Sequence, residues 1–451
     1  MVTYHHHISQ HDTDIGLHFI NPKRITTLLI VSIAVLLLCT TTHQAHAGVA
    51  GQDYTITAKD GTDLGLMRYA AKGEHLIIWL APSTHERVTQ VAGRLAQLGI
   101  EVWQIDLAEA LFLPNSTEQM RSFNGKYVAE LIRIAHAQTH KKILLAARGY
   151  GSIPLLRGAR LWQTQQANSG GDVYLKGAIL FSPDLYSTIP ALGLEPQYVP
   201  ITYATNIPLM IIQDGKRGNR NYLDRLANTL LTGGSQPMLK ILPGVAGLFF
   251  SKDDSTETLQ AIEHLPHDVK TAISLLEKLP TPRKPAPMTT VFKPLGSGLD
   301  SQLRAFKGKF QPYPIDLATA SGSRYRRDHY QGQITIVNFW ATWCSPCVKE
   351  IPSLNRLRTQ MQGMPFELIS INFSESIDAV HQFMKKVDVE FPVLLDSDGG
   401  MAVKWKVLTL PSTFIIGPDG KIRYGVNAAI HWDNPDVVSA LKQLLPQNQP
   451  H

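Results

Sequence analysis

Short apolar runs of strand length recur along the first half of the chain, with amphipathic stretches between them. Two stretches, residues 85–98 and 118–138, have apolar residues spaced as on one face of a helix. Unbroken apolar runs are typical of strands buried on both faces of a parallel sheet. The pattern therefore predicts that residues 52–278 form an α/β domain with a mostly parallel sheet covered by helices. The apolar runs lie at residues 75–80, 102–106, 142–147, 178–181 and 208–212.

The last third of the chain predicts a second α/β domain over residues 301–446. Helices are expected from Ser345 onward and over residues 375–387 and 435–445. Between the two domains, residues 279–300 contain five prolines and little apolar periodicity, which predicts a semi-extended linker. A chain of 451 residues is also longer than one hydrophobic core usually serves. Strands of the second domain are expected at residues 334–341, 366–371, 391–395, 412–416 and 421–425.

The N-terminus has the pattern of an export signal. Lys23 and Arg24 precede an apolar run of 14 residues, 25–38, and residues 45–47 form a small-x-small cleavage sequence. The run is shorter than the roughly 20 residues of a transmembrane helix. We therefore expect residues 1–47 to be a signal peptide that directs the protein to the periplasm or another extracytoplasmic space. The alternative is an uncleaved signal that anchors the protein in the inner membrane.

Cysteine usage and charge narrow the classes of function. The chain has three cysteines, and cleavage after Ala47 would remove Cys39 and leave only Cys344 and Cys347, a pair suited to an oxidising compartment. A zinc site needs four ligands, so this single pair predicts no metal site, and we expect no cofactor. The net charge of +6 is spread along the chain without a run of basic residues, which argues against nucleic-acid binding.

The Cys344-Ser345-Pro346-Cys347 motif stands where a predicted buried strand ends and a helix begins. The unpaired N–H groups and the dipole at a helix N-terminus favour a thiolate at the first cysteine. We therefore predict that Cys344 is the exposed attacking sulfur and that Cys347, one turn further in, resolves the mixed disulfide. Pro346 fits an early helical position, where its missing N–H has no cost. The alternatives for this motif are a zinc half-site and an inert structural disulfide.

The segments around the dithiol resemble the exported thioredoxin-like reductases of the TlpA/ResA group. The resemblance covers roughly the last 140 residues and implies a thioredoxin fold. It implies that Pro411 is a cis-proline facing the dithiol, that Leu410 lends its backbone to a substrate strand, and that Trp343 contacts the substrate. It also places a functional glutamate at Glu350. The segments that carry the resemblance are Asn338-Phe-Trp-Ala-Thr-Trp-Cys-Ser-Pro-Cys347, Glu350 with Pro352, Phe391-Pro-Val, Leu410-Pro-Ser-Thr-Phe414 and Pro418-Asp-Gly-Lys421.

Glu350 is also a candidate base because of its spacing from the dithiol. Three positions after Cys347 is close to one helical turn, so the carboxylate of Glu350 can lie under the dithiol. A partly buried carboxylate has a raised pKa and can take a proton from the resolving thiol. Asn338 stands where cytoplasmic thioredoxins have an aspartate, which leaves Glu350 as the nearby candidate base. The alternative is a solvated glutamate on the outer face of the helix.

The resemblance implies a protein that reduces the disulfides of partner proteins outside the cytoplasm, with electrons from a membrane thiol carrier. Cytochrome c maturation and envelope redox homeostasis are the processes in which we expect it to act. Three alternatives stay open for the whole chain: a disulfide oxidase, an isomerase, and a scaffold whose dithiol is vestigial. A reduction potential near about −270 mV would indicate a reductase, and one near about −120 mV an oxidase.

The first domain resembles the α/β-hydrolase fold in the order of its predicted strands. The segment after residues 142–147 has the shape of a nucleophile elbow, but Gly149 takes the position of the serine in Gly-x-Ser-x-Gly. Residues 242–248 contain no histidine where such enzymes usually have one, and neither His264 nor His267 fits that place. We therefore predict a non-catalytic binding domain. The alternative is a hydrolase with a relocated nucleophile, such as Ser152 or Ser182.

Overall fold

The structure is a computed structural model that describes residues 48–82, 85–167, 172–249, 254–288 and 303–446. The predicted signal peptide at residues 1–47, with Cys39 and the alternative membrane anchor, lies outside the described residues, as do linker residues 289–300. Linker residues 279–288 are described and form neither helix nor strand. No helix within the described ranges combines the length and the apolar character that a membrane span requires.

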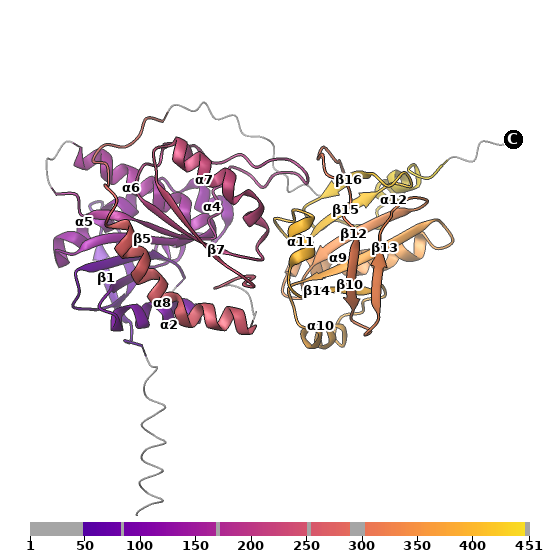
Figure 1. Ribbon diagram of the computed structural model, residues 1–451, viewed down its shortest axis with the longest axis horizontal. Helices are drawn as coiled ribbons and strands as arrows, with labels where there is room; N and C mark the ends of the chain where they lie inside the picture. The colour runs from indigo at the N-terminus through magenta and orange to yellow at the C-terminus, as the bar shows by residue number, and fades with distance from the viewer. Residues whose placement is uncertain (1–47, 83–84, 168–171, 250–253, 289–302, 447–451) are drawn as a thin grey trace, which may run out of the picture. The chain divides into compact units, whose positions relative to one another are not determined.

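The first domain is built on an eight-stranded sheet with the strand order β1-β2-β4-β3-β5-β6-β7-β8 (Figure 1). The strand β2 is antiparallel to both of its neighbours, β1 and β4, and all other neighbouring strands are parallel. The predicted mostly parallel sheet is therefore confirmed, and the five predicted runs correspond to β3 to β7. The strands are β1 (Gln52–Thr57), β2 (Asp63–Tyr69), β3 (His75–Leu80), β4 (Glu101–Ile105), β5 (Lys142–Arg148), β6 (Leu175–Phe181), β7 (Leu209–Asp214) and β8 (Pro237–Leu242).

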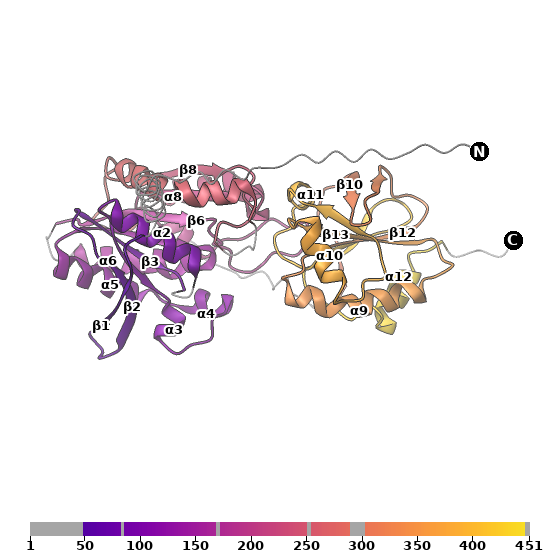
Figure 2. The ribbon, with the colours of Figure 1, turned by 90° about the horizontal axis from the view of Figure 1, so that it is seen from below.

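Helices cover both faces of this sheet (Figure 2). They are α2 (Glu86–Gln97), α3 (Leu107–Ala110), α4 (Thr117–Ser122), α5 (Lys126–Thr139), α6 (Ser152–Gln166), α7 (Leu223–Thr232) and α8 (Thr256–Leu276), with 3-10 turns η1 (Gly149–Gly151), η2 (Pro200–Ala204) and η3 (Gly218–Tyr222). Successive residues of a strand point to opposite faces. Leu76 and Ile78 of β3 therefore share a core with α5 and α6, whereas Ile77 and Trp79 share the other core with α2 and α8.

The prediction of one helix over residues 118–138 is wrong. The chain forms α4 and α5 instead, with Gly125 between them at a φ of +85°. A Cβ at position 125 would lie 2.3 Å from the backbone nitrogen of Gly158 in α6. Glycine is required both by the left-handed backbone and by this close approach to the neighbouring helix. A tertiary contact therefore separates the two helices, and the periodicity of the sequence could not show it.

The second domain has its own eight-stranded sheet, with the strand order β11-β10-β14-β13-β12-β15-β16-β9. The central strand β12 is parallel to β13 and antiparallel to β15. The five predicted strands correspond to β12 to β16. The strands are β9 (Arg304–Ala305), β10 (Ile315–Thr319), β11 (Arg324–Arg327), β12 (Ile334–Trp340), β13 (Phe366–Phe373), β14 (Val393–Asp396), β15 (Ser412–Ile416) and β16 (Ile422–Val426).

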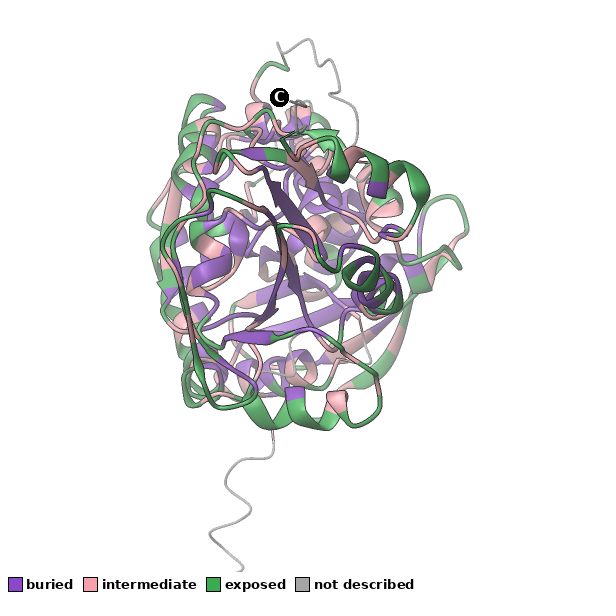
Figure 3. Cartoon of the chain, turned by 90° about the vertical axis from the view of Figure 1, so that its right-hand side faces the viewer, coloured by how far each residue is buried: buried purple, intermediate pink, exposed green. Residues whose placement is uncertain are grey.

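Four helices complete the described part of this domain: α9 (Ser345–Gln360), α10 (Ile377–Met384), α11 (Gly400–Lys404) and α12 (Pro435–Lys442). Ile336 and Trp340 of β12 share a core with α9 and α12, whereas Val337 and Phe339 share the other core with α11. In Figure 3 the strands are largely buried, and exposed positions gather on helices and loops. By the same alternation Asn338 lies on the α9 side of the sheet, which matters for the site described below.

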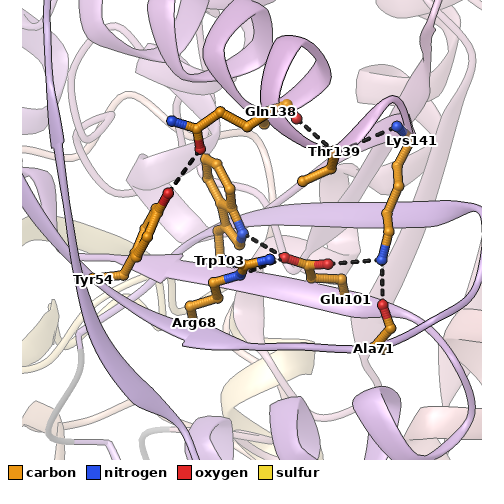
Figure 4. Close-up of polar contacts among 9 residues, drawn as sticks. Tyr54, Arg68, Ala71, Glu101, Trp103, Gln138, Thr139 and Lys141 are labelled. Atoms are coloured by element: carbon orange, nitrogen blue, oxygen red, sulfur yellow. Dashed lines mark hydrogen bonds and ion pairs between the residues drawn. The ribbon is translucent and has the colours of Figure 1, made fainter.

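A buried charge cluster stabilises the first sheet where β2 meets β4 (Figure 4). Glu101 is 2% exposed, and its carboxylate pairs with Arg68 Nε at 2.8 Å and with Lys141 Nζ at 2.7 Å. It also accepts a hydrogen bond from Trp103 Nε1 at 2.9 Å, and Lys141 donates a second bond to the carbonyl of Ala71. Burial raises the pKa of Glu101, but the bonds from Lys141, Trp103 and Arg68 outweigh this effect and leave it below its usual value.

Candidate active site

The dithiol lies at the junction between a buried strand and a helix, since β12 ends at Trp340 and α9 begins at Ser345. Cys344 is the N-cap of α9 and forms a disulfide with Cys347, with 5.3 Å between their Cα atoms. The Cys344 sulfur also accepts a hydrogen bond from the N–H of Cys347 at 3.3 Å. The expectation that the Cys344 sulfur is exposed is wrong, because Cys344 is only 6% exposed in this disulfide form. Cys347 is fully buried, so Cys344 is still the more accessible of the two.

Glu350 lies in the second turn of α9 and is only 2% exposed. Its carboxylate accepts hydrogen bonds from Asn338 Nδ2 at 2.9 Å and from Trp432 Nε1 at 3.1 Å. Burial raises the pKa of Glu350 to about 7, although the two donors oppose the rise. The alternative of a solvated glutamate is therefore wrong. A carboxyl group that titrates near neutral pH can both accept and donate a proton under ordinary conditions.

Two partners of Glu350 come from other elements of the domain. Asn338 donates from Nδ2 both to Glu350 and to Thr413 Oγ1, the latter at 2.9 Å, so it links α9 to β15. Trp432 is fully buried and lies 82 residues away from Glu350 in the sequence. The alternation along β12 was a signal that could have placed Asn338 beside α9. No local pattern pointed to Trp432.

The segment Leu410–Pro411 and the side chain of Trp343 are the other predicted parts of the site. The Leu410–Pro411 peptide bond is cis, the isomer that the resemblance implies, and Pro411 directly precedes β15. Leu410 is half-buried, whereas Trp343 is 50% exposed and adjacent to Cys344 in the chain. An exposed tryptophan offers a large apolar surface to a partner. The roles of Leu410, Pro411 and Trp343 in substrate binding stay predictions.

Glu375 is a residue of this region that the sequence did not bring to attention. Its carboxylate accepts hydrogen bonds from the N–H of Thr342 at 2.7 Å and from the Thr342 hydroxyl at 2.5 Å. It also accepts one from Asn372 Nδ2 at 2.7 Å. Glu375 therefore ties the loop that follows β13 to the segment that precedes Cys344. Its place just after a central strand was the only available signal.

No metal-binding group emerges within the described ranges, since nowhere in them do three or more His, Cys, Asp or Glu side chains come together in a way that could hold an ion.

The comparisons with known proteins match the part of the chain that contains the dithiol. Residues 304–425 match the family model described as the AhpC/TSA family. Thiol-disulfide oxidoreductase ResA of Bacillus subtilis (strain 168) is 39% identical over 106 residues, which are 24% of this chain and 59% of that protein. ResA of Geobacillus thermodenitrificans (strain NG80-2) is 32% identical over 130 residues, which are 29% of this chain and 74% of that protein. The chain belongs to the ResA family.

The ResA-family region corresponds to the second domain, which has a thioredoxin fold with the dithiol at the start of α9. A solved structure of a thiol:disulfide interchange protein, a thioredoxin family protein from Chlorobium tepidum TLS, is 21% identical to the chain. The match covers 29% of the present chain and 94% of the Chlorobium tepidum chain, with a TM-score of 0.26. The chain spans 59% of the length of the Bacillus subtilis ResA.

A second candidate site lies in the first domain, outside the ResA-family region. The carboxyl ends of parallel strands there line a cleft of about 400 Å³. Gly149 follows β5 directly with a φ of +53°, so a sharp turn is present without a nucleophilic side chain. Ser152 and Ser182 are both fully buried, and the Ser182 hydroxyl accepts a hydrogen bond from the N–H of Asp214 at 2.9 Å. Neither alternative nucleophile is therefore accessible to a substrate.

Proposed function

We propose that this protein is a thiol–disulfide oxidoreductase that reduces disulfides of client proteins outside the cytoplasm. The observation that carries the proposal is a Cys344–Cys347 disulfide at the N-terminus of α9, one helical turn before a buried carboxyl group whose pKa is near 7. Membership of the ResA family supports the same activity. The export pattern of residues 1–47 supports the extracytoplasmic location.

The reduction proceeds in two exchanges that balance in electrons. The Cys344 thiolate attacks one sulfur of a client disulfide, and the other client sulfur leaves as a thiolate. Cys347 then attacks the Cys344 sulfur, which forms the Cys344–Cys347 disulfide and releases the second client thiolate. Glu350 accepts the proton of the Cys347 thiol as it becomes nucleophilic. The client gains two electrons, and the dithiol loses two.

Return to the dithiol requires two electrons from another thiol pair. We propose a membrane thiol carrier as this donor, and cytochrome c maturation or envelope redox homeostasis as the process that the protein serves. An oxidase, an isomerase and a scaffold with a vestigial dithiol are the competing functions. They share the same two cysteines, so the direction of electron flow has to be measured.

The test measures the reduction potential of the Cys344–Cys347 pair in the purified protein. The protein is equilibrated with glutathione buffers, and thiol alkylation then quantifies the reduced fraction. We expect a reduction potential of about −270 mV, as in thioredoxin, whereas a reduction potential of about −120 mV would identify an oxidase. Failure of the dithiol to form or to exchange at all would support the scaffold. The Cys344→Ser variant is the matched control that cannot form the couple.

For the first domain we propose an α/β-hydrolase-like fold that binds a ligand and does not hydrolyse it. The strand order, the sharp turn at Gly149 and the cleft at the carboxyl ends of the strands support the fold. Binding is favoured over hydrolysis because glycine at position 149 has no nucleophilic side chain and because Ser152 and Ser182 are buried.

A further inference from the structure

The cleft of the first domain has an apolar wall. Trp79 of β3, Met120 of α4 and Phe249 are among the side chains that line it, and Trp79 contacts Phe249 edge to face with 5.6 Å between the ring centroids. A cleft of about 400 Å³ lies within the size range of small-molecule sites, which are usually apolar with a few polar groups that orient the ligand. The wall therefore suits a ligand that buries an aliphatic chain.

The charged residues that line the cleft, two acidic and two basic, cancel in net charge and are engaged within the chain. Asp106 is the N-cap of α3 and accepts hydrogen bonds from two N–H groups of that helix, at 2.9 and 3.2 Å. Asp184 pairs with Arg217 at 2.6 Å, and Arg148 also interacts with other groups of the chain. An ionic ligand would lose its hydration without meeting an unpaired opposite charge among the described lining residues. The cleft therefore favours an uncharged ligand.

Tyr150 is the polar group of the lining that is best suited to orient such a ligand. Its hydroxyl oxygen accepts a hydrogen bond from Arg121 Nη2 at 3.0 Å. A hydroxyl group that accepts one bond can still donate its own hydrogen, and no described residue accepts this one. Burial, and then the charge of Asp184, raise the pKa of Tyr150 to about 12, so the hydroxyl keeps its proton at neutral pH. Tyr150 is therefore a neutral donor for an oxygen atom of the ligand.

The loop between α3 and α4 adds exposed apolar surface beside the cleft. Leu107 and Asn115, which lie on either side of this loop in the chain, both line the cleft. Phe112 is 97% exposed and has a φ of +53°, a backbone conformation that is uncommon for a bulky residue. Leu113 is 38% exposed. The surface next to the cleft is thus also suited to apolar contact.

We propose that this cleft binds an uncharged aliphatic molecule that carries one carbonyl oxygen. The aliphatic chain lies along Trp79, Met120 and Phe249, and the carbonyl oxygen accepts a hydrogen bond from the Tyr150 hydroxyl. The inference rests on the proposed binding role of the first domain and names the class of ligand. A ketone meets both requirements, whereas a fatty acid or an alkylamine carries a charge that the paired residues of the lining do not compensate.

The test compares 2-octanone with octanoate and octylammonium, a negative and a positive probe that also have eight carbons, by calorimetric titration of the purified full-length protein at pH 7. We expect 2-octanone to bind at least tenfold more tightly than either charged probe. Tyr150→Phe removes only the hydroxyl and should weaken 2-octanone binding about fivefold, the effect of one neutral hydrogen bond. The matched control is Tyr203→Phe, a partly buried tyrosine that does not line the cleft, and it should bind 2-octanone like the natural protein.

A second variant tests the apolar wall. Met120→Trp places a larger side chain in the cleft and should weaken 2-octanone binding at least tenfold, whereas Gln119→Trp, at a neighbouring position of α4 that does not line the cleft, should not. The proposal is overturned if 2-octanone does not bind, if a charged probe binds equally well, or if neither Tyr150→Phe nor Met120→Trp changes 2-octanone binding. The comparison of probes on the natural protein stays decisive if a variant does not fold. Turnover of p-nitrophenyl octanoate, measured separately, would refute the binding-only role of the domain without bearing on whether 2-octanone binds.

Discussion

Glu350 is held in an environment far from that of a free carboxylate in water. It is 2% exposed, and the hydrogen bonds to its oxygens come from neutral groups, the side chains of Trp432 and Asn338 and the backbone of Ile430. Neutral donors stabilise a carboxylate less than a paired cation does, so burial prevails and the pKa rises to about 7. A base with this pKa is suited to move the proton of Cys347 near neutral pH.

The first prediction concerns the pH profile of exchange. In the natural protein the rate of client reduction should rise as pH increases through about 7, because Glu350 becomes a competent base. Glu350→Gln should remove this inflection and slow exchange at neutral pH by roughly a hundredfold, the lower range for general-base catalysis. Stopped-flow reduction of a model disulfide peptide measures both effects. The exposed Glu390→Gln serves as control, and a Glu350→Gln profile identical to the natural one would remove Glu350 from the mechanism.

The second prediction concerns stability and follows from the same raised pKa. Between the ordinary value of 4.5 and about 7, folded Glu350 keeps its proton while the unfolded chain has lost it. Stability of the second domain should therefore fall as pH rises through this window, by about 3 kcal/mol in total, and stay level above it. Urea unfolding at pH 5 and pH 8 measures the change. Glu350→Gln should not show it, and an equal fall in the variant would contradict the assignment.

The third prediction concerns the order of the two sulfurs. Cys344 is the N-cap of α9 and the more accessible of the pair, so it should form the mixed disulfide with clients. The Cys347→Ser variant should accumulate client adducts that thiol reductant releases, and mass spectrometry of the adducts should locate them on Cys344. Adducts that accumulate instead on Cys347 of Cys344→Ser would reverse the roles.

At the scale of elements, the fourth prediction concerns the cluster that joins β2 to β4. Glu101→Gln would leave the partly buried cations of Arg68 and Lys141 without their carboxylate, so the first domain should lose about 3 kcal/mol. Glu74→Gln is the matched control, because its ion pair with Lys142 is exposed and should contribute less than about 1 kcal/mol. Urea unfolding at pH 7 compares the two variants, and equal losses would contradict the importance of burial.

The stability that this cluster gives the natural protein should depend on pH in the acid range. The pKa of Glu101 is lowered in the fold, so its contribution is present above the ordinary pKa of a glutamate and is lost as pH falls through the lowered value. Glu101→Gln should flatten that part of the stability curve below pH 4.5.

At the scale of the whole molecule, the fifth prediction is that the protein reduces disulfides but has no reactive serine. A serine-directed fluorophosphonate probe should not label the protein, because Gly149 has no nucleophile and Ser152 and Ser182 are buried. Intact-mass spectrometry after incubation measures this. Disulfide reduction by the same sample is the control for folded protein. Stoichiometric labelling of a serine would favour the hydrolase alternative.

The sequence by itself determined the features that depend on neighbours along the chain. The apolar runs of β3 to β7 and β12 to β16 predicted both sheets, since burial on two faces requires uninterrupted apolar residues. The position of Cys344 at the start of α9 followed from a strand, a cysteine pair and a helical periodicity in immediate succession.

The tertiary structure alone decided which distant groups meet. Trp432 reaches Glu350 across 82 residues, and Glu375 reaches Thr342 across 33. The helix break at Gly125 depends on the approach of Gly158, and the cleft brings Arg148, Asp184 and Arg217 together from the ends of three strands. Burial, hydrogen bonding and pKa are set by atoms within a few ångströms in space, and spacing along the chain does not determine those distances.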